Sequence, residues 1–268
     1  GSSQQALNFA AMGVASGHQD LVIAAGVESM SRITMGSDMF LQGEMVTPSP
    51  KMSWKYNIIP QGLSAELVAE RFDLSREELD AFSYESHQRA AAADDAGKFD
   101  RETISMDVHN EEKGDFSFGN DEGIRRSTTI EKLGSLKPAF KEDGVITAAS
   151  SSQISDGSAA IMIASKAAVE KYGLKPRAKI VSMATAGVDP TIMLTAPIGA
   201  TQRALARAGL NIGDLGAIEL NEAFASVALG CGRELGMDFA KVNVYGGAIA
   251  LGHPLGASGA RLITTLLN

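Results

Sequence analysis

The sequence contains little cysteine, few aromatic residues and no long apolar segment, and each shortage excludes a class of protein. Cys231 is the single cysteine among 268 residues, which excludes a disulfide framework within the chain and is typical of a reducing compartment. No apolar run reaches the ~20 residues that span a bilayer. The net charge of −8 comes without a basic stripe, which argues against a nucleic-acid-binding protein.

The composition that remains is that of an ordinary globular chain. Hydrophobic residues make up 44% and charged residues 21%, and 268 residues can form one large domain or two. Because only 6% of the residues are aromatic and 28 are glycine, we expect a core of small and aliphatic side chains with closely packed backbones.

Apolar segments of strand and helix type alternate along much of the chain. We expect strand 21–26 to be buried on both faces, and the nearly uniformly apolar helix 2–16 to be buried on several sides. This alternation predicts layered α/β packing. The other predicted strands are 157–164, 178–184 and 217–220, and the other predicted helices are 166–172, 197–208 and a run that follows residue 221 to about 235.

The region 31–140 differs from the rest because it is rich in methionine, proline and charge and lacks buried-strand segments. Ser75 and Glu78 form a capping-box pattern, which predicts a helix that ends at Gly97. Residues 110–135 are polar and interrupted by glycines, so we expect a loop there. From composition alone, the region is an inserted lid or a small separate domain.

Residues 246–261, GGAIALGHPLGASGAR, combine many glycines with a single histidine. His253 precedes Pro254, which disfavours helix at the histidine, so we expect a rigid loop before a helix that begins near Ser258. A histidine at such a place can act as a general base or on a developing oxyanion. Composition alone fits equally well with a helix-capping loop that carries an incidental histidine.

A second motif places an amide and a carboxylate at a predicted strand-to-helix junction. Strand 217–220 leads directly into Asn221, Glu222 and a helical run. Junctions at the carboxyl ends of strands are where α/β sheets place ligands. We therefore expect Asn221 to pair with His253 as a polarising unit.

These two motifs, NEAFA at 221–225 and the glycine-rich 246–261, closely resemble the thiolases, the acetyl-CoA acetyltransferase and 3-ketoacyl-CoA thiolase family. The resemblance covers essentially the whole chain. It implies a layered α-β-α-β-α fold, incomplete at both ends, with an inserted loop domain. The implied divisions are residues 1–30 and 141–185 as the remainder of the N-terminal half, 31–140 as the loop domain, and 186–268 as the truncated C-terminal half.

The resemblance also exposes a departure from the family pattern. Residues 1–8 resemble the family's nucleophile helix, and the nucleophilic cysteine would stand immediately before Gly1. The second catalytic cysteine, in a Cys-x-Gly motif, would lie beyond residue 268. We therefore expect a fragment of a thiolase that lacks both cysteines and is inactive as printed.

The resemblance implies catalytic roles for residues of the two motifs. His253 would activate the missing cysteine and share an oxyanion hole with Asn221, which would hold a catalytic water by the thioester oxygen. Glu222 would orient these groups, or carry a charge tuned by burial, although a purely structural role fits as well.

The resemblance also implies two contacts with coenzyme A. Ser152 lies in a segment similar to the family's loop against the pantetheine arm, but the family usually has Gly-Asn at 149–150 and often Gly at the position of Gln153. Arg125 matches a position where thiolases place an arginine near the adenine, where a guanidinium can stack and meet phosphates.

The remaining candidate side chains are expected to have no catalytic role. Cys231 does not stand at the position of either catalytic cysteine of the family, so we expect it to be a small buried residue of a helix. The other histidines, with no metal-ligand spacing, are predicted to lie on the surface; they are His18, His87 and His109.

Several expectations about ligands and assembly follow from the resemblance. It implies coenzyme A and acyl-CoA as substrates, with no metal and no permanently bound cofactor. The absence of nucleic acid and membrane partners is expected instead from the charge and the lack of a long apolar run. The assembly is a homodimer or homotetramer, and the compartment is the cytoplasm, with mitochondria and peroxisomes left open. Two alternatives remain: a non-catalytic CoA-binding or assembly homologue, and a related condensing enzyme such as a ketoacyl synthase.

Overall fold

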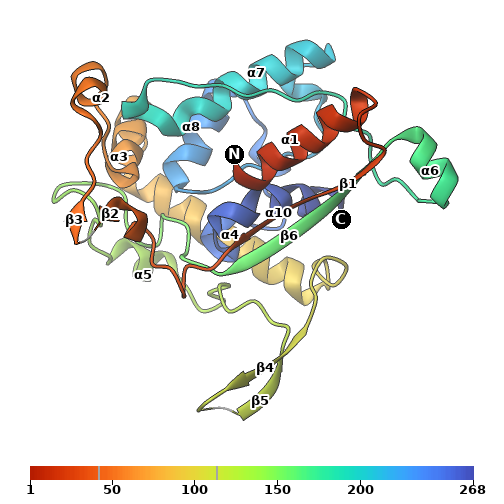
Figure 1. The fold of residues 1–268 in the computed structure, drawn as a ribbon. Helices are drawn as coiled ribbons and strands as arrows, with labels where there is room; N and C mark the ends of the chain where they lie inside the picture. The colour runs from red at the N-terminus through yellow and green to blue at the C-terminus, as the bar shows by residue number, and fades with distance from the viewer. Residues whose placement is uncertain (42, 113) are drawn as a thin grey trace.

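The computed structural model describes residues 1–41, 43–112 and 114–268, and part of its core is a two-stranded sheet. Strand β1 (Leu21–Glu28) pairs antiparallel with β6 (Gly157–Ala164), which lies far away in the sequence. Helices α1 (Ser2–Ala15) and α10 (Leu255–Leu267) pack side by side against this sheet (Figure 1). The sheet therefore brings the glycine-rich C-terminal motif next to the N-terminal helix.

Glycine allows the close approach of α10 to the sheet and to α1. A Cβ atom on Gly26 would lie 2.0 Å from the carbonyl oxygen of Gly256, and one on Gly259 would lie 2.3 Å from the backbone nitrogen of Gln4. The Ser3 hydroxyl accepts a hydrogen bond of 2.9 Å from the backbone N–H of Ala260. The glycines of residues 246–261 thus serve packing as well as the loop around His253.

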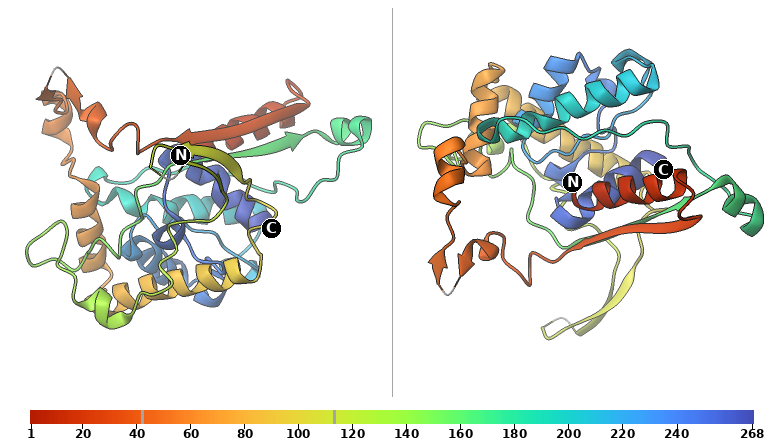
Figure 2. Two further views of the ribbon diagram at one scale, coloured as in Figure 1. Left: turned by 90° about the horizontal axis from the view of Figure 1, so that it is seen from below. Right: turned by 45° about the horizontal axis from the view of Figure 1, so that its top comes forward.

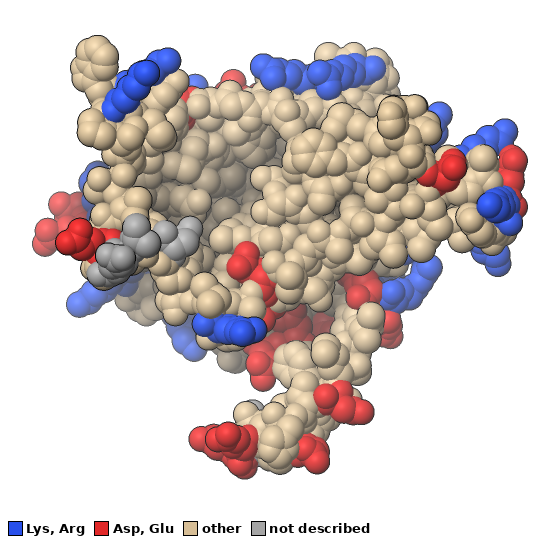
Figure 3. Space-filling view, viewed as in Figure 1, with Lys and Arg blue, Asp and Glu red and all other residues tan. Residues whose placement is uncertain are grey.

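The outer face of this layer is exposed, which contradicts part of the sequence prediction. Strand 21–26 was expected to be buried on both faces and helix 2–16 on several sides, but Ile23 is 64% exposed and Phe9 63% exposed. The strand and helix themselves are present. Figure 3 shows a broad area without charged side chains over α1 and the two strands. The cause is that α1 and α10 cover the same face of the sheet.

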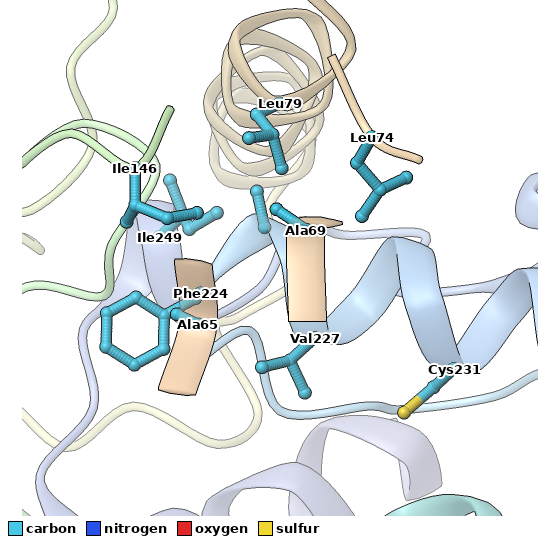
Figure 4. Packing of buried hydrophobic residues seen from close by; sticks show 10 residues of the cluster. Ala65, Ala69, Leu74, Leu79, Ile146, Phe224, Val227, Cys231 and Ile249 are labelled. Atoms are coloured by element: carbon cyan, nitrogen blue, oxygen red, sulfur yellow. The ribbon is translucent and has the colours of Figure 1, made fainter. Parts of the chain in front are cut away.

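A second and larger core lies among α3 (Gln61–Arg71), α4 (Arg76–Asp95) and α8 (Ala225–Leu235). Figure 4 shows its side chains converging from these helices and from the segments around them. Its buried members are aliphatic with one aromatic ring and one thiol: Ala65, Ala69, Leu74, Leu79, Ile146, Phe224, Ala225, Val227, Cys231 and Ile249.

The predicted helix boundaries in this region are confirmed. Ser75 accepts a hydrogen bond from the Glu78 backbone, and the Glu78 carboxylate accepts one from the Ser75 backbone, so the capping box is formed. Gly97 follows the helix with φ of +64°, a conformation that suits glycine at a helix end.

The remaining elements lie around these two cores (Figure 2), and all of them except α7 are short. They are η1 (Ser37–Met39), β2 (Phe40–Leu41), β3 (Glu44–Met45), α2 (Pro50–Lys55), β4 (Met106–Asn110), β5 (Gly114–Phe118), α5 (Ile130–Gly134), α6 (Lys166–Tyr172), η2 (Pro190–Thr195), α7 (Ala196–Ala208), η3 (Ile212–Asp214), η4 (Phe239–Lys241) and α9 (Ala248–Leu251). The helices predicted at 166–172 and 197–208 are thus confirmed. In the described part of the chain, no helix combines the length and apolarity needed to cross a membrane.

The loop predicted at 110–135 is partly wrong. Strands β4 and β5 form an antiparallel hairpin that projects from the body, and α5 follows it (Figure 1). The available signal was the alternation of apolar and polar residues, with Met106 and Val108 in β4 and Phe116 and Phe118 in β5. Thr129 caps α5 by accepting a hydrogen bond of 3.2 Å from the backbone N–H of Lys132.

Two predicted strands are also wrong. Residues 178–184 form no strand, and the side chain of Val181 is 70% exposed. Residues 217–220 form a single parallel bridge between Ile218 and Val242 in place of a strand. A strand needs a hydrogen-bonded neighbour, and no ladder forms on either segment within residues 1–41, 43–112 and 114–268.

Candidate active site

His253 lies on the short connection between α9 and α10. Gly252 precedes it with φ of +84°, and α10 begins at Leu255, three residues before the predicted start near Ser258. The Nε2 atom of His253 is 3.2 Å from the Nδ2 atom of Asn221, and its Nδ1 atom is 2.5 Å from the Ser258 hydroxyl oxygen. The structure therefore brings the two candidate catalytic residues together.

The hydrogen bonds around His253 assign its tautomer. The Ser258 hydroxyl donates to the carbonyl oxygen of Pro254 at 3.0 Å, so its oxygen accepts the N–H of His253 Nδ1. The Nε2 atom then carries a lone pair, which accepts from the Asn221 amide. Burial, followed by the charge of Arg261, lowers the pKa of His253 to about 4. At neutral pH the imidazole is uncharged and can take a proton at Nε2.

Asn221 is positioned by the backbone that precedes it. Asn243, which is buried, accepts a hydrogen bond from the Leu220 N–H and donates one to the Leu220 carbonyl, both at 2.8 Å. The Oδ1 atom of Asn221 is buried and has no hydrogen-bond partner within the described residues. A buried acceptor of this kind fits an ordered water at the site.

Glu222 is the most strongly buried carboxylate of the site, with 1% of its surface exposed. It accepts hydrogen bonds from the Ser86 hydroxyl at 2.7 Å, the Asn243 amide at 2.8 Å and the Ile249 N–H at 3.1 Å. Burial raises the pKa of Glu222, and these donors oppose that shift. The carboxylate links α4, the Asn221 junction and the start of α9.

A partly buried charged pair, Glu219 and Arg261, lies near the site, and sequence reasoning missed it. The Nη1 atom of Arg261 on α10 is 3.8 Å from Glu219 Oε2, and neither atom has a hydrogen-bond partner among the residues described. Burial raises the pKa of Glu219 to about 7. An arginine inside the apolar helix α10 was the available signal, because a charge on such a face requires a partner.

Ser152 lies beside the Asn221 junction. Its backbone N–H donates to the Ala223 carbonyl at 3.0 Å, and Ser151 forms an antiparallel bridge with Phe224. This geometry places the serine-rich loop next to the candidate catalytic residues.

Arg125 lies on an exposed loop that is fixed through its backbone. Its N–H donates to His87 Nδ1 at 3.2 Å. His87 was predicted to lie on the surface, and this prediction is wrong because only 3% of the residue is exposed. Burial, followed by Arg125, lowers the pKa of His87 to about 4. His18 and His109 are exposed, as predicted.

Cys231 is 1% exposed on α8, and burial raises the pKa of its thiol to about 12. A thiol that is neither accessible nor ionised is a poor nucleophile. The prediction of a small buried helix residue is confirmed. Across the residues that the structure describes, no cluster of three or more potential ligand side chains could hold a metal ion.

Comparisons with known proteins identify the fold and the family. Residues 1–167 match the model of the thiolase N-terminal domain, and residues 174–268 match that of the thiolase C-terminal domain. The chain superposes on a crystal structure of human mitochondrial 3-ketoacyl-CoA thiolase with a TM-score of 0.88 and 37% sequence identity. The match covers 100% of this chain and 69% of the other.

Curated relatives agree with this match. The chain is 46% identical to the steroid 3-ketoacyl-CoA thiolase FadA6 of Mycobacterium tuberculosis, covering 100% of this chain and 66% of the relative. It is 44% identical to an acetyl-CoA acetyltransferase of Chromobacterium violaceum, of which it covers 70%. The chain thus spans about two thirds of the length of these relatives.

The fold is that of the layered α/β acyltransferases, and the matches cover the chain almost from end to end. The chain belongs to the thiolase family, whose members are enzymes that act on CoA thioesters.

Proposed function

We propose that the whole protein is an acyl-CoA C-acyltransferase that transfers an acyl group between a cysteine thioester and coenzyme A or acetyl-CoA. The reaction would be the thiolytic cleavage of a 3-ketoacyl-CoA or the reverse Claisen condensation. The observation that carries this proposal is the 3.2 Å contact between Asn221 Nδ2 and His253 Nε2, with the imidazole held uncharged.

In this proposal His253 is the proton acceptor. A cysteine other than Cys231 gives its thiol proton to Nε2, and the thiolate attacks the carbonyl carbon of the 3-ketoacyl group. The bond between that carbonyl carbon and C2 breaks, the C2 carbanion takes a proton and leaves as acetyl-CoA, and the remaining acyl group stays on the cysteine sulfur. The thiol of coenzyme A then takes the acyl group. Asn221, directly or through a water at Oδ1, stabilises the negative oxygen.

Other residues would bind and orient the substrate. Ser152 would contact the pantetheine arm, and Arg125 would meet the adenine and its phosphates with its exposed guanidinium. Glu222 would orient Asn221 and α9 through its buried hydrogen bonds. The division into halves 1–30 with 141–185 and 186–268 around a loop domain 31–140 is part of the same proposal, as are assembly as a homodimer or homotetramer, cytoplasmic localisation and the lack of a permanently bound cofactor.

The 268-residue chain as printed should not catalyse thiolysis, because its one thiol is buried and un-ionised. The expected result is that no thioester bond is lost when the chain is mixed with acetoacetyl-CoA and coenzyme A. Thiolysis by this chain alone would show that another group serves as the nucleophile.

The test of the proposal is thiolysis of acetoacetyl-CoA by the whole protein and its His253→Ala variant. Removing the general base should lower kcat on the order of 10²-fold or more. Matched replacement of the exposed His18 by Ala should leave the rate unchanged. An unchanged rate for His253→Ala would remove this residue from the mechanism, and an inactive wild-type protein would favour a CoA-binding homologue without catalysis.

A further inference from the structure

Gln153 makes contacts that the sequence motifs do not suggest. Its Nε2 atom lies 2.8 Å from the Gly123 carbonyl oxygen, 2.8 Å from that of Ile249 and 2.9 Å from that of Ala250. Its own carbonyl oxygen accepts the backbone N–H of His253 at 3.2 Å. A single residue therefore joins the loop that carries Arg125 to the turn before His253 and to the backbone of His253 itself.

The three carbonyl oxygens determine which end of the Gln153 amide faces them. Only the NH₂ group can donate, because the amide oxygen would be repelled by three acceptors. Two N–H groups serve three acceptors, so one N–H is shared. An oxygen in place of this nitrogen would remove every one of these hydrogen bonds.

Gln153 and Glu222 together hold the short helix α9, and we call this pair of contacts the clamp. This helix is a single turn, and its last carbonyl groups have no partner within the helix. Gln153 satisfies two of these carbonyls, while Glu222 accepts the Ile249 N–H from the other side at 3.1 Å. Buried or partly buried side chains thus fix both ends of the turn that precedes His253.

The contact with Gly123 extends the clamp to the Arg125 loop. A Cβ atom on Gly123 would lie 2.6 Å from the Ala250 carbonyl oxygen, so the two loops touch at this glycine. The Gly123 N–H donates to Asp121 Oδ1 at 2.7 Å, and the Arg125 N–H donates to His87. The loop is fixed on both sides of the point that Gln153 binds.

We propose that Gln153 is a positioning residue that couples the candidate nucleotide-binding loop at 121–126 to the turn that places His253. Binding at one loop then restricts the other, because both share the same amide. This inference rests on the proposed function for the identity of the ligand, but the clamp itself is present without a ligand.

Backbone amide hydrogen exchange of the protein without ligand tests the clamp. Gln153→Met keeps the length of the side chain and removes the donor, and Gln153→Glu places an oxygen against three carbonyls. Exchange should accelerate on the order of tenfold at both 121–126 and 248–252, with the larger effect for Gln153→Glu. Gln202→Met, the same change at an exposed position of α7, is the matched control and should leave both segments unchanged.

The coupling is tested with adenosine 3′,5′-bisphosphate, which lacks the thiol-bearing arm of coenzyme A. In the wild-type chain this probe should slow exchange at 121–126 and also at 248–252. In Gln153→Met it should slow exchange at 121–126 only. Protection of 248–252 that persists in Gln153→Met would overturn the coupling.

The nucleotide site proposed for Arg125 and the clamp formed by Gln153 can be refuted independently of each other. If the probe protects neither segment of the wild-type chain, the nucleotide site assigned to Arg125 is wrong. The exchange of the ligand-free variants still decides the clamp: acceleration confined to one segment, or rates equal to those of Gln202→Met, would overturn it.

Discussion

Two glutamates on either side of Asn221, the buried Glu222 and the partly buried Glu219, are held in different ways. Glu222 receives three hydrogen bonds from donors on three segments. Glu219 Oε2 lies 3.8 Å from Arg261 Nη1 and has no hydrogen-bond partner within the described residues. Three well-aligned donors make a carboxylate part of the scaffold, whereas a loosely paired carboxylate remains free to change its charge.

Replacing Glu222 should have the largest effect on stability. Glu222→Ala leaves the Ser86 hydroxyl, the Asn243 amide and the Ile249 N–H buried without an acceptor, which should lower the free energy of unfolding by about 3–5 kcal/mol. Urea unfolding measures this change.

An exposed glutamate provides the control for that experiment. Glu170 is 69% exposed on α6 and lies 3.8 Å from Lys166, so Glu170→Ala should change the free energy of unfolding by no more than about 0.5 kcal/mol. Equal losses for the two variants would contradict the scaffold role of Glu222.

Glu219 should instead affect how the free energy of unfolding depends on pH. Its folded pKa of about 7 is above the ordinary value of 4.5, so the folded state binds this proton more tightly than the unfolded chain does. The resulting stabilisation is complete below pH 4.5 and is lost as the pH rises to about 7, a change of about 3 kcal/mol.

The measurement is urea unfolding of the wild type and Glu219→Gln at several pH values. Between pH 4.5 and 7, the wild type should lose about 3 kcal/mol of unfolding free energy relative to Glu219→Gln. A difference that is constant with pH would show that Glu219 titrates normally, and the contrast with Glu222 would then disappear.

Local signals predicted the helices well. The capping box at Ser75 and Glu78 and the glycine that ends α7 act within a few residues, so the sequence alone could locate them. The strand predicted at 178–184 failed because a strand depends on a neighbour that no local pattern supplies.

The sequence predicted only those residues of the candidate site that belong to a recognisable motif. His253 and Asn221 belong to motifs, and the structure places them in contact. The burial of His87 and the clamp by Gln153 depend on contacts between distant segments; Gln153 and Ile249 are 96 residues apart in the sequence. Pairs of this kind have no local signature, because tertiary packing creates them.

The central claim is that His253 is an uncharged base with its lone pair at Nε2. Nitrogen-15 NMR of the imidazole through a pH titration tests it directly, because the chain has only 4 histidines. The account predicts a proton on Nδ1, a bare Nε2 and a pKa of about 4. A proton on Nε2 at neutral pH, or a pKa near the ordinary 6.5, would contradict it.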